Sequence, residues 1–260
     1  MNQGFQRFLQ VWFESKPGQV VFNQEKTLVD AALANKFGYY LVQLGCISEQ
    51  SLLGQSRVST KILIDLELSK TLKGHGVQWI RADFDFLPIG RDKIDVVLMP
   101  HMLESVDDPY YVLRQVDSML LPEGHVVVTG FNPAGCLPLR FKLFSKNFGF
   151  EKASYRRAAK VREWFKVLGY EVEETTYSPV MCFSTNDKYK IWARIIEKIE
   201  RSLQWLGFEF GNVYCIVAKK KVDSPTMVGA KWHLPSWKTT KNGTVASQRV
   251  KAHKFENKNN

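Results

Sequence analysis

Short apolar segments alternate with segments of helical periodicity along most of the chain, and this alternation constrains the fold more than any other feature. Each apolar segment has the length and the β-branched or aromatic content of a buried strand. The predicted strands lie at 39–45, 60–67, 77–83, 94–100, 125–131, 170–178 and 212–220. Strands that alternate with helices build a parallel, doubly wound α/β sheet, whose carboxyl edge is where ligands bind.

The predicted helices begin before the first strand, with two amphipathic segments at 5–14 and 20–37. The KPG tripeptide between them predicts a break. A third helix follows Asp108, which is a capping residue in front of a proline, and a fourth lies near 156–168. The helix at 187–206 has an aliphatic stripe that predicts burial against the sheet, while its basic face leaves a membrane surface as the alternative.

The formal net charge of +10 raises the question of a nucleic-acid partner. Residues 219–260 contain ten Lys or Arg and two acidic residues, so the preceding residues carry only +2. A nearly neutral body with a basic end is not the pattern of a DNA-reading fold. We therefore expect N-terminal helices at 1–38, a globular domain at 39–221 and a basic, disordered tail at 222–260.

The tail has aromatic residues among its lysines, namely Trp232, Trp237 and Phe255. Aromatic rings between cations can stack on single-stranded nucleic acid. Because the tail has no run of five like charges, a solvated appendage is the simpler interpretation, and contact with RNA or an acidic partner is the alternative.

The four cysteines, Cys46, Cys136, Cys182 and Cys215, lie far apart with no CxxC pair. This spacing predicts neither a metal site nor a disulfide framework, and it fits a reduced, cytoplasmic protein. No run approaches the eighteen apolar residues of a transmembrane helix, and the first residues lack the continuous apolar region of a secretory signal.

The stretch from Ala82 to Pro133 is the most informative about function. Its successive elements are Asp83, Leu87-Pro88-Ile89, the strand at 94–100, His101-Met102-Leu103-Glu104, Asp108-Pro109, Leu121-Pro122-Glu123-Gly124 and the strand at 125–131. In this order the stretch closely resembles the class I S-adenosylmethionine-dependent methyltransferases of the type 11 family. The segments FGYYLVQLG and GFNP narrow the resemblance to an uncharacterised gammaproteobacterial branch of that family.

The resemblance implies a Rossmann-like methyltransferase sheet of seven strands, with the strand at 212–220 antiparallel inside the sheet. It also implies S-adenosylmethionine as the cofactor. The absence of a helix after the strand at 212–220 agrees with this fold better than with a dehydrogenase.

The loop after the first strand departs from the family pattern of an acid followed by G-x-G-x-G. Gln43 stands in place of the acid, and Gly45 is the only one of the three glycines that is kept. Ile47 and Glu49 would each place a Cβ where the family has glycine, which lets the backbone approach the cofactor closely. Two interpretations follow: a remodelled cofactor site that includes Gly45, or a sheet that has lost its ligand.

The resemblance assigns the adenosine half of the cofactor to residues after the second and third strands. The Asp83 carboxylate would accept the adenine amino protons, and the Phe84 backbone N–H would meet the ring edge; the alternative is an Asp that only caps a turn. Glu67 matches the family's acid-x-Ser, and its two oxygens can accept both ribose hydroxyls. A shift in register would give this role to Asp65, and a solvated surface acid is the alternative for Glu67.

His101 and Glu104 follow the fourth strand, where the acceptor would meet the methyl group. Methyl transfer needs positioning and, for a protonated nucleophile, a general base. His101 is the candidate catalytic residue, and a packing role is its alternative.

We therefore expect a methyltransferase that acts on an unknown acceptor. The alternative of a different class is a catalytically inactive, methyltransferase-like binding module that uses its basic tail for RNA or acidic partners.

Overall fold

The computed structural model describes residues 3–48, 50–66, 76–135, 137–138, 154–179 and 211–221. All of them belong to the unit Met1–Val222, and the second unit, Asp223–Asn260, lies outside them. The predicted helix at 187–206 and the predicted tail at 222–260 also lie outside the described residues.

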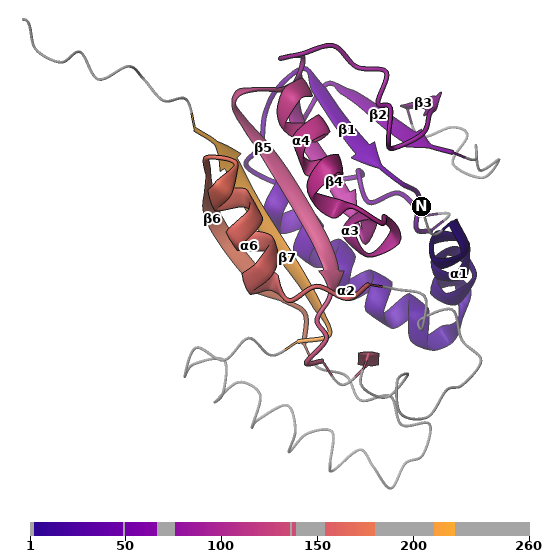
Figure 1. Ribbon diagram of the computed structural model, residues 1–260. Helices are drawn as coiled ribbons and strands as arrows, with labels where there is room; N and C mark the ends of the chain where they lie inside the picture. The colour runs from indigo at the N-terminus through magenta and orange to yellow at the C-terminus, as the bar shows by residue number, and fades with distance from the viewer. Residues whose placement is uncertain are drawn as a thin grey trace, which may run out of the picture. The chain divides into compact units, whose positions relative to one another are not determined.

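A sheet of seven strands forms the centre of the described unit (Figure 1). Its strands are β1 (Tyr40–Leu44), β2 (Thr60–Asp65), β3 (Val77–Arg81), β4 (Ile94–Pro100), β5 (Leu120–Phe131), β6 (Tyr170–Tyr177) and β7 (Val213–Lys220). Their order is β3-β2-β1-β4-β5-β7-β6. The first five pair in parallel, and β7 lies antiparallel between β5 and β6. The predicted methyltransferase topology, with its inserted antiparallel strand, is confirmed.

Strand β5 begins at Leu120, five residues before the predicted start at 125. The Pro-Glu-Gly segment at 122–124 lies within this strand, where Glu123 adopts a positive φ of 64°. The register against β4 shifts between Ile94 and Val96. Helix α4 (Pro109–Met119) is therefore followed directly by β5, whose first residues form an irregular part of the strand.

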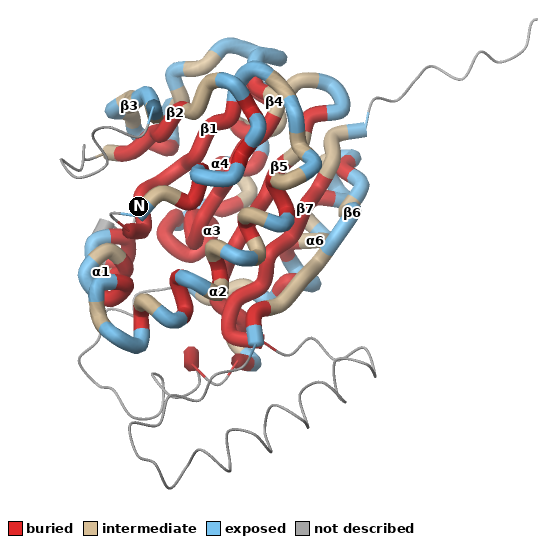
Figure 2. The backbone as a smooth tube through the Cα atoms, turned by 180° about the vertical axis from the view of Figure 1, so that it is seen from behind, coloured by how far each residue is buried: buried red, intermediate tan, exposed pale blue. Residues whose placement is uncertain are grey.

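The N-terminal helices α1 (Gln3–Glu14) and α2 (Lys16–Leu33) cover one face of the sheet (Figures 1 and 2). Both helices contribute to one buried apolar cluster with residues from β1, β4, β5 and β7. Phe13 of α1 and Phe22 of α2 meet edge to face, with ring centroids 5.6 Å apart. The two helices thus form a layer of the domain rather than a separate appendage before it.

The break between α1 and α2 lies at Ser15, not at the KPG tripeptide, which forms the first turn of α2. The Ser15 hydroxyl accepts a hydrogen bond from the Gly18 N–H, as an N-cap residue does. Pro17 is tolerated in the first turn because its missing N–H has no intrahelical partner there. A Cβ on Gly18 would collide with the backbone of Trp12 and Phe13, so this glycine allows the close turn between the helices.

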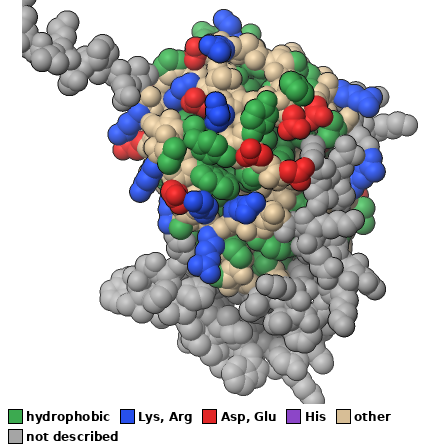
Figure 3. Space-filling view, in the orientation of Figure 1, with side chains coloured by type: hydrophobic (Ala, Val, Ile, Leu, Met, Phe, Trp, Pro, Cys, Tyr) green, Lys and Arg blue, Asp and Glu red, His purple; other side chains and the backbone are tan. Residues whose placement is uncertain are grey.

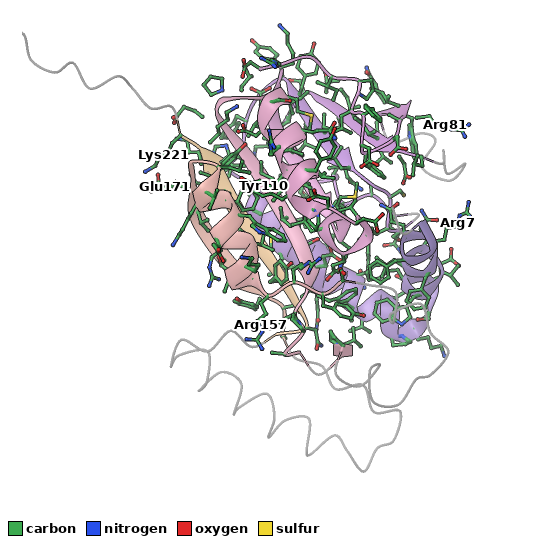
Figure 4. The ribbon with its side chains drawn as sticks, viewed as in Figure 1. Arg7, Arg81, Tyr110, Arg157, Glu171 and Lys221 are labelled. Carbon is green, nitrogen blue, oxygen red and sulfur yellow. The ribbon has the colours of Figure 1, made fainter. Side chains whose placement is uncertain are left out.

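Helices α3 (Met102–Ser105), α4 and α6 (Ala158–Val167) lie on the other face of the sheet (Figure 1). Acidic and basic side chains are interspersed over this face (Figure 3), in line with the nearly neutral charge of the body. At the outer end of β6 and β7, Glu171 and Lys221 form a surface ion pair with an oxygen–nitrogen distance of 3.2 Å (Figure 4).

The described part of the connection between β1 and β2 contains no helix. Instead this connection buries Leu52, Leu53 and Val58 in the apolar cluster of α1 and α2. The N-terminal helices therefore occupy the face that a crossover helix would otherwise cover.

Candidate functional site

The loops after β1, β2, β3 and β4 share one edge of the sheet, because parallel strands all end on the same side. Gly45 follows β1 and His101 follows β4, while Asp65 and Arg81 are the last residues of β2 and β3. This carboxyl edge is the candidate functional site.

Gly45 adopts a positive φ of 85°, a conformation that glycine reaches without strain. Its N–H donates to the Ile64 carbonyl over 2.8 Å. Its carbonyl accepts from Gln43 Nε2, also over 2.8 Å. A carboxylate at position 43 has no proton to donate, so the change from the family's acid to glutamine allows this contact.

Cys46 has both of its backbone polar groups bound by other residues. Its N–H donates to Asp65 Oδ2 over 2.7 Å, and its carbonyl accepts from Gln10 Nε2 of α1 over 2.8 Å. Together with the two bonds of Gly45, all four polar backbone groups of this dipeptide are taken by the chain itself. We call residues 45–48 the first loop, and in this conformation its first two residues have no backbone N–H that is not already used.

Ile47, which replaces a glycine of the family pattern, has a buried side chain. It is 1% exposed and packs in the apolar cluster of α1 and α2. Ser48 is buried as well. Glu49, the other residue that replaces a glycine, lies outside the described residues. The first loop is packed as part of the core rather than presented at the surface.

Asp83 lies in an exposed turn after β3. Its Oδ1 accepts from the Asp85 N–H over 3.1 Å, and its carbonyl accepts from the Phe86 N–H. The carboxylate therefore caps a turn, as the alternative interpretation predicts, and the residue is still exposed to solvent. The capping contact is made by one carboxylate oxygen, so the two interpretations are compatible.

Phe84 is fully buried in the apolar core of the α3, α4 and α6 face. Its carbonyl accepts from Gln115 Nε2 of α4 over 3.0 Å, and the same nitrogen bonds the Asp85 carbonyl over 2.8 Å. Gln115 Oε1 accepts from the Leu87 N–H. One side chain of α4 thus holds the whole turn after β3.

His101 has no exposed surface, and its backbone is left-handed with a φ of 49°. Its Nδ1 lies 2.7 Å from Glu104 Oε2, and its Nε2 lies 3.2 Å from Glu25 Oε2. Burial alone would lower the pKa of His101, but the two carboxylates overcome it and raise the pKa to about 10. The imidazole is therefore a buried cation between two acids.

The remaining oxygens of these acids bind the end of β5. Glu104 Oε1 accepts from the Phe131 N–H over 2.7 Å, and Glu25 Oε1 accepts from the Thr129 hydroxyl over 2.6 Å. Burial raises the pKa of the Glu104 carboxyl against the opposing effect of His101. The cluster joins α2, α3 and the carboxyl ends of β4 and β5.

His101 was predicted as a catalytic base, but in this conformation both ring nitrogens are bound and none of its surface is exposed. In this geometry His101 packs between α2 and α3 and pairs with one carboxylate from each helix. Glu25 was missed at the level of sequence. The available signal was a charged residue on the buried side of α2, one turn from Phe22 and Val29.

Glu67, predicted to bind ribose, lies outside the described residues. Asp65, the residue that a shift in register would substitute for it, is 5% exposed and bound to Cys46. Within the described ranges, no group of three His, Cys, Asp or Glu side chains could hold a metal ion. None of the described helices has the length and apolar character that crossing a bilayer requires.

Comparison with known families matches residues 10–175 to the model described as a methyltransferase domain. Since this match covers more than half of the chain, the protein belongs to the methyltransferase domain family, and its sheet has the class I arrangement. The family thus confirms the class that the resemblance at residues 82–133 predicts.

A curated relative is an uncharacterised protein, YafS, of Escherichia coli strain K12. It is 27% identical over 138 residues, which are 52% of this chain and 54% of that protein. The match spans about half of the relative's length.

Solved methyltransferases share the fold. A chain of the complex between the Trm112 methyltransferase activator and a methyltransferase from Haloferax volcanii has a TM-score of 0.59 at 15% identity, over 85% of this chain and 99% of that one. An S-adenosylmethionine-dependent methyltransferase from Thermotoga maritima has a TM-score of 0.57 at 16% identity, over 82% of this chain and 100% of that one. An S-adenosylmethionine-dependent methyltransferase from Mesorhizobium loti has a TM-score of 0.53 at 18% identity, over 76% of this chain and 98% of that one.

Proposed function

We propose that this protein transfers a methyl group from S-adenosylmethionine to an acceptor, and that the acceptor binds outside the carboxyl ends of β4 and β5. The observation that carries the proposal is the sheet order with β7 antiparallel between β5 and β6, together with the exposed carboxylate of Asp83 after β3. When bound, the cofactor supplies an activated methyl group on a sulfonium centre.

The family pattern assigns the adenosine end of the cofactor to residues after β2 and β3. The Asp83 carboxylate is exposed and would accept the adenine amino protons, with the Phe84 backbone beside it. Glu67, in the family's acid-x-Ser position, is our candidate for the ribose hydroxyls. These assignments come from the family pattern, and the exposed turn at Asp83 supports them.

The first loop fits the cofactor poorly, because the backbone groups of Gly45 and Cys46 are already bonded within the chain. Gly45 stays in the proposed site as the one retained glycine. His101, buried between two acids, would act on the reaction by positioning the ends of β4 and β5 rather than by touching the acceptor.

Calorimetric titration with S-adenosylhomocysteine, the product form of the cofactor, tests the proposal. The parent protein should bind it, and Asp83→Asn should weaken binding by about 1–3 kcal/mol because a charged acceptor is lost while the turn-capping oxygen is kept. Asp85→Asn, in the same exposed turn, is the matched control and should bind as the parent does. A parent protein that binds no S-adenosylhomocysteine would refute the proposal.

The closed first loop favours a second candidate, a methyltransferase-like binding module without cofactor. In that case the loop would be closed permanently, and the basic segment at 222–260 would contact RNA or an acidic partner. The same titration separates the two candidates, since the module should bind no S-adenosylhomocysteine and should retain RNA at low salt only in its full-length form.

We also place the protein in a reducing compartment, the cytoplasm. Cys46 and Cys215, the two described cysteines, are buried thiols, and burial raises the pKa of the Cys215 thiol to about 12. Thiols in this state are typical of proteins that are not stabilised by disulfides.

A further inference from the structure

Three aromatic side chains are exposed together at the amino edge of the sheet, opposite the edge where the cofactor is proposed to bind. Phe37, Tyr39 and Tyr40 lie between the end of α2 and the first residue of β1, and they are 64%, 76% and 45% exposed. None of the three belongs to a buried apolar cluster of the described chain. Single exposed rings are common on protein surfaces, but three within four residues form a group that packing does not explain.

The backbone of this aromatic segment is held in place by Asp95 of β4. Its Oδ2 accepts from the N–H groups of both Tyr39 and Tyr40, each over 2.9 Å. A Cβ on Gly38 would collide with the Asp95 side chain, so glycine allows this close approach. On the other side, the Tyr39 carbonyl accepts from the Thr60 N–H over 2.8 Å. Because the backbone is fixed from both sides, a ligand that binds the rings would not have to order it.

Positive charge is concentrated around these rings. Three segments at the starts of β1, β2 and β4 form this part of the edge, and we call them together the amino-edge patch: 34–40, 55–61 and 90–95. They contain five Lys or Arg and two acidic residues, whereas the first 218 residues as a whole carry a net charge of only +2. The surplus of three positive charges is therefore local, and it favours a polyanionic partner.

Four of the five cations have no carboxylate partner among the described residues. Lys36 pairs with Glu173 over 2.7 Å. The others, which form no ion pair within the described chain, are Arg57, Lys61, Arg91 and Lys93. Arg57 instead lies over the Phe37 ring, with 5.6 Å between the guanidinium carbon and the ring centroid. A cation beside an exposed ring can bind the phosphate and the base of one nucleotide together.

We propose that the amino-edge patch binds single-stranded RNA, with bases stacked on the exposed rings and phosphates next to the unpaired cations. Stacking on aromatic rings tolerates any base, and cations beside the rings follow the charged backbone. Exposed polar side chains in the same segments, Asn35, Gln55 and Ser59, can bond the ribose 2′-hydroxyl that distinguishes RNA from DNA. The patch lies away from the carboxyl edge, so this RNA binding does not depend on the proposed methyl transfer.

An anionic membrane surface is the rival partner, because it also attracts cations and aromatic rings. A surface that enters the bilayer normally presents exposed aliphatic side chains as well, and the exposed large apolar side chains of the patch are all aromatic. The patch is also built from strand ends and connections rather than from an amphipathic helix. RNA is therefore the partner that the patch fits better.

Fluorescence anisotropy with the full-length protein tests the proposal. The probes are a labelled, unstructured RNA of about 12 nucleotides and a DNA of the same sequence, both at low salt. Tyr39→Ala removes the most exposed ring of the patch and leaves its backbone bonds to Asp95 and Thr60 in place. Phe86→Ala, which removes a 78% exposed ring at the carboxyl edge, is the matched control. Thermal unfolding would show that each variant is folded.

The parent should bind the RNA more tightly than the DNA. Tyr39→Ala should weaken RNA binding by about 5- to 150-fold, the range for one lost stacking contact, and Phe86→Ala should bind as the parent does. Arg57→Gln should reduce the slope of the logarithm of the binding constant against the logarithm of the salt concentration by about 0.7, the value for one phosphate contact on a single strand. Arg157→Gln, an exposed arginine at the start of α6 (Figure 4), should keep the slope of the parent.

RNA binding by Tyr39→Ala that equals that of the parent, or an unchanged salt slope in Arg57→Gln, would overturn the proposal, because the RNA would then contact another part of the chain. DNA binding as tight as RNA binding would also overturn it, as would a parent protein that binds no RNA. Loss of binding to phosphatidylserine vesicles in Tyr39→Ala, with RNA binding unchanged, would assign the patch to a membrane surface instead. S-adenosylhomocysteine binding should not change in Tyr39→Ala, so the proposed function is tested separately.

Discussion

The carboxyl edge of the sheet has two halves that differ in how they are held. The closed half consists of the first loop and His101, and its polar groups are bound by Gln10 of α1 and Glu25 of α2. The open half is the turn at 83–86, which is largely exposed and is held by Gln115 of α4.

The two halves are held by different parts of the chain: one by a helix that connects two strands of the sheet, the other by the N-terminal helices. Helix α4 belongs to the connection between β4 and β5, so the open half is held by an element of the sheet's own connections. The closed half depends on α1 and α2, which precede the sheet in the chain. The closed half is also the one that departs from the family pattern, at Gln43 and Ile47, whereas the open half keeps Asp83.

The largest expected effect is on the closed half. Glu25→Ala should lower the free energy of unfolding by about 3–5 kcal/mol, because it removes one of the two carboxylates that face the buried His101 and leaves His101 Nε2 and the Thr129 hydroxyl buried without that acceptor. Urea unfolding followed by circular dichroism measures the change. Glu163→Ala, an exposed glutamate on α6, should stay within about 0.5 kcal/mol of the parent. A loss below about 1 kcal/mol for Glu25→Ala would contradict the buried cluster.

The protonation of His101 is a second test of the closed half. Its pKa in the folded protein, about 10, exceeds the unfolded value of about 6.5, so its contribution to stability is full below pH 6.5 and is lost as the pH rises towards 10. Nitrogen-15 NMR of the imidazoles should show His101 still protonated at pH 8. His125 is the internal control and should be neutral there, since burial and Lys36 lower its pKa. A His101 midpoint near 6.5 would show that its two acids do not face it as described.

The open half should respond to Gln115. Gln115→Ala removes two donors and one acceptor from the turn, and should cost about 1–2 kcal/mol of stability and speed amide exchange at Leu87, whose N–H loses its acceptor. Tyr111→Phe removes only a long contact of 3.4 Å to the Asp85 carbonyl and should change stability by less than about 0.5 kcal/mol. Unchanged exchange at Leu87 in Gln115→Ala would mean that the turn does not depend on α4.

The smallest effect should come from deleting residues 223–260, which we propose to be dispensable for both halves. The deleted segment has little aliphatic content, so ordering it would cost more than its burial returns. It holds seven Lys or Arg and two acidic residues, so the formal net charge falls from +10 to +5 and the protein should elute earlier from a cation exchanger. An unchanged melting temperature is expected, and a truncated protein that unfolds would show that Trp232 or Trp237 packs on the body.

Much of the fold could be predicted because its signals are local. The apolar segments give the strands directly, and Asp108 with Pro109 gives the start of α4. The boundary between α1 and α2 was misplaced because Pro17 and Gly18 are common both in breaks and in the first turn of a helix. The packing of α1 and α2 on one face of the sheet was not foreseen, since the pattern of alternation does not show which face a helix covers.

The sequence by itself determined the alternation of strands and helices, because this depends on the types and spacing of nearby residues, whereas the antiparallel last strand and the altered residues of the first loop were predicted from the resemblance to the family. Only the tertiary structure decided what the altered residues do. Glu25 and His101 are 76 residues apart, and Gln10 and Cys46 are 36 apart, so no local pattern pairs them. Their contacts exist because α1 and α2 pack on the sheet, and that packing determines which polar groups at the carboxyl edge remain available to a ligand.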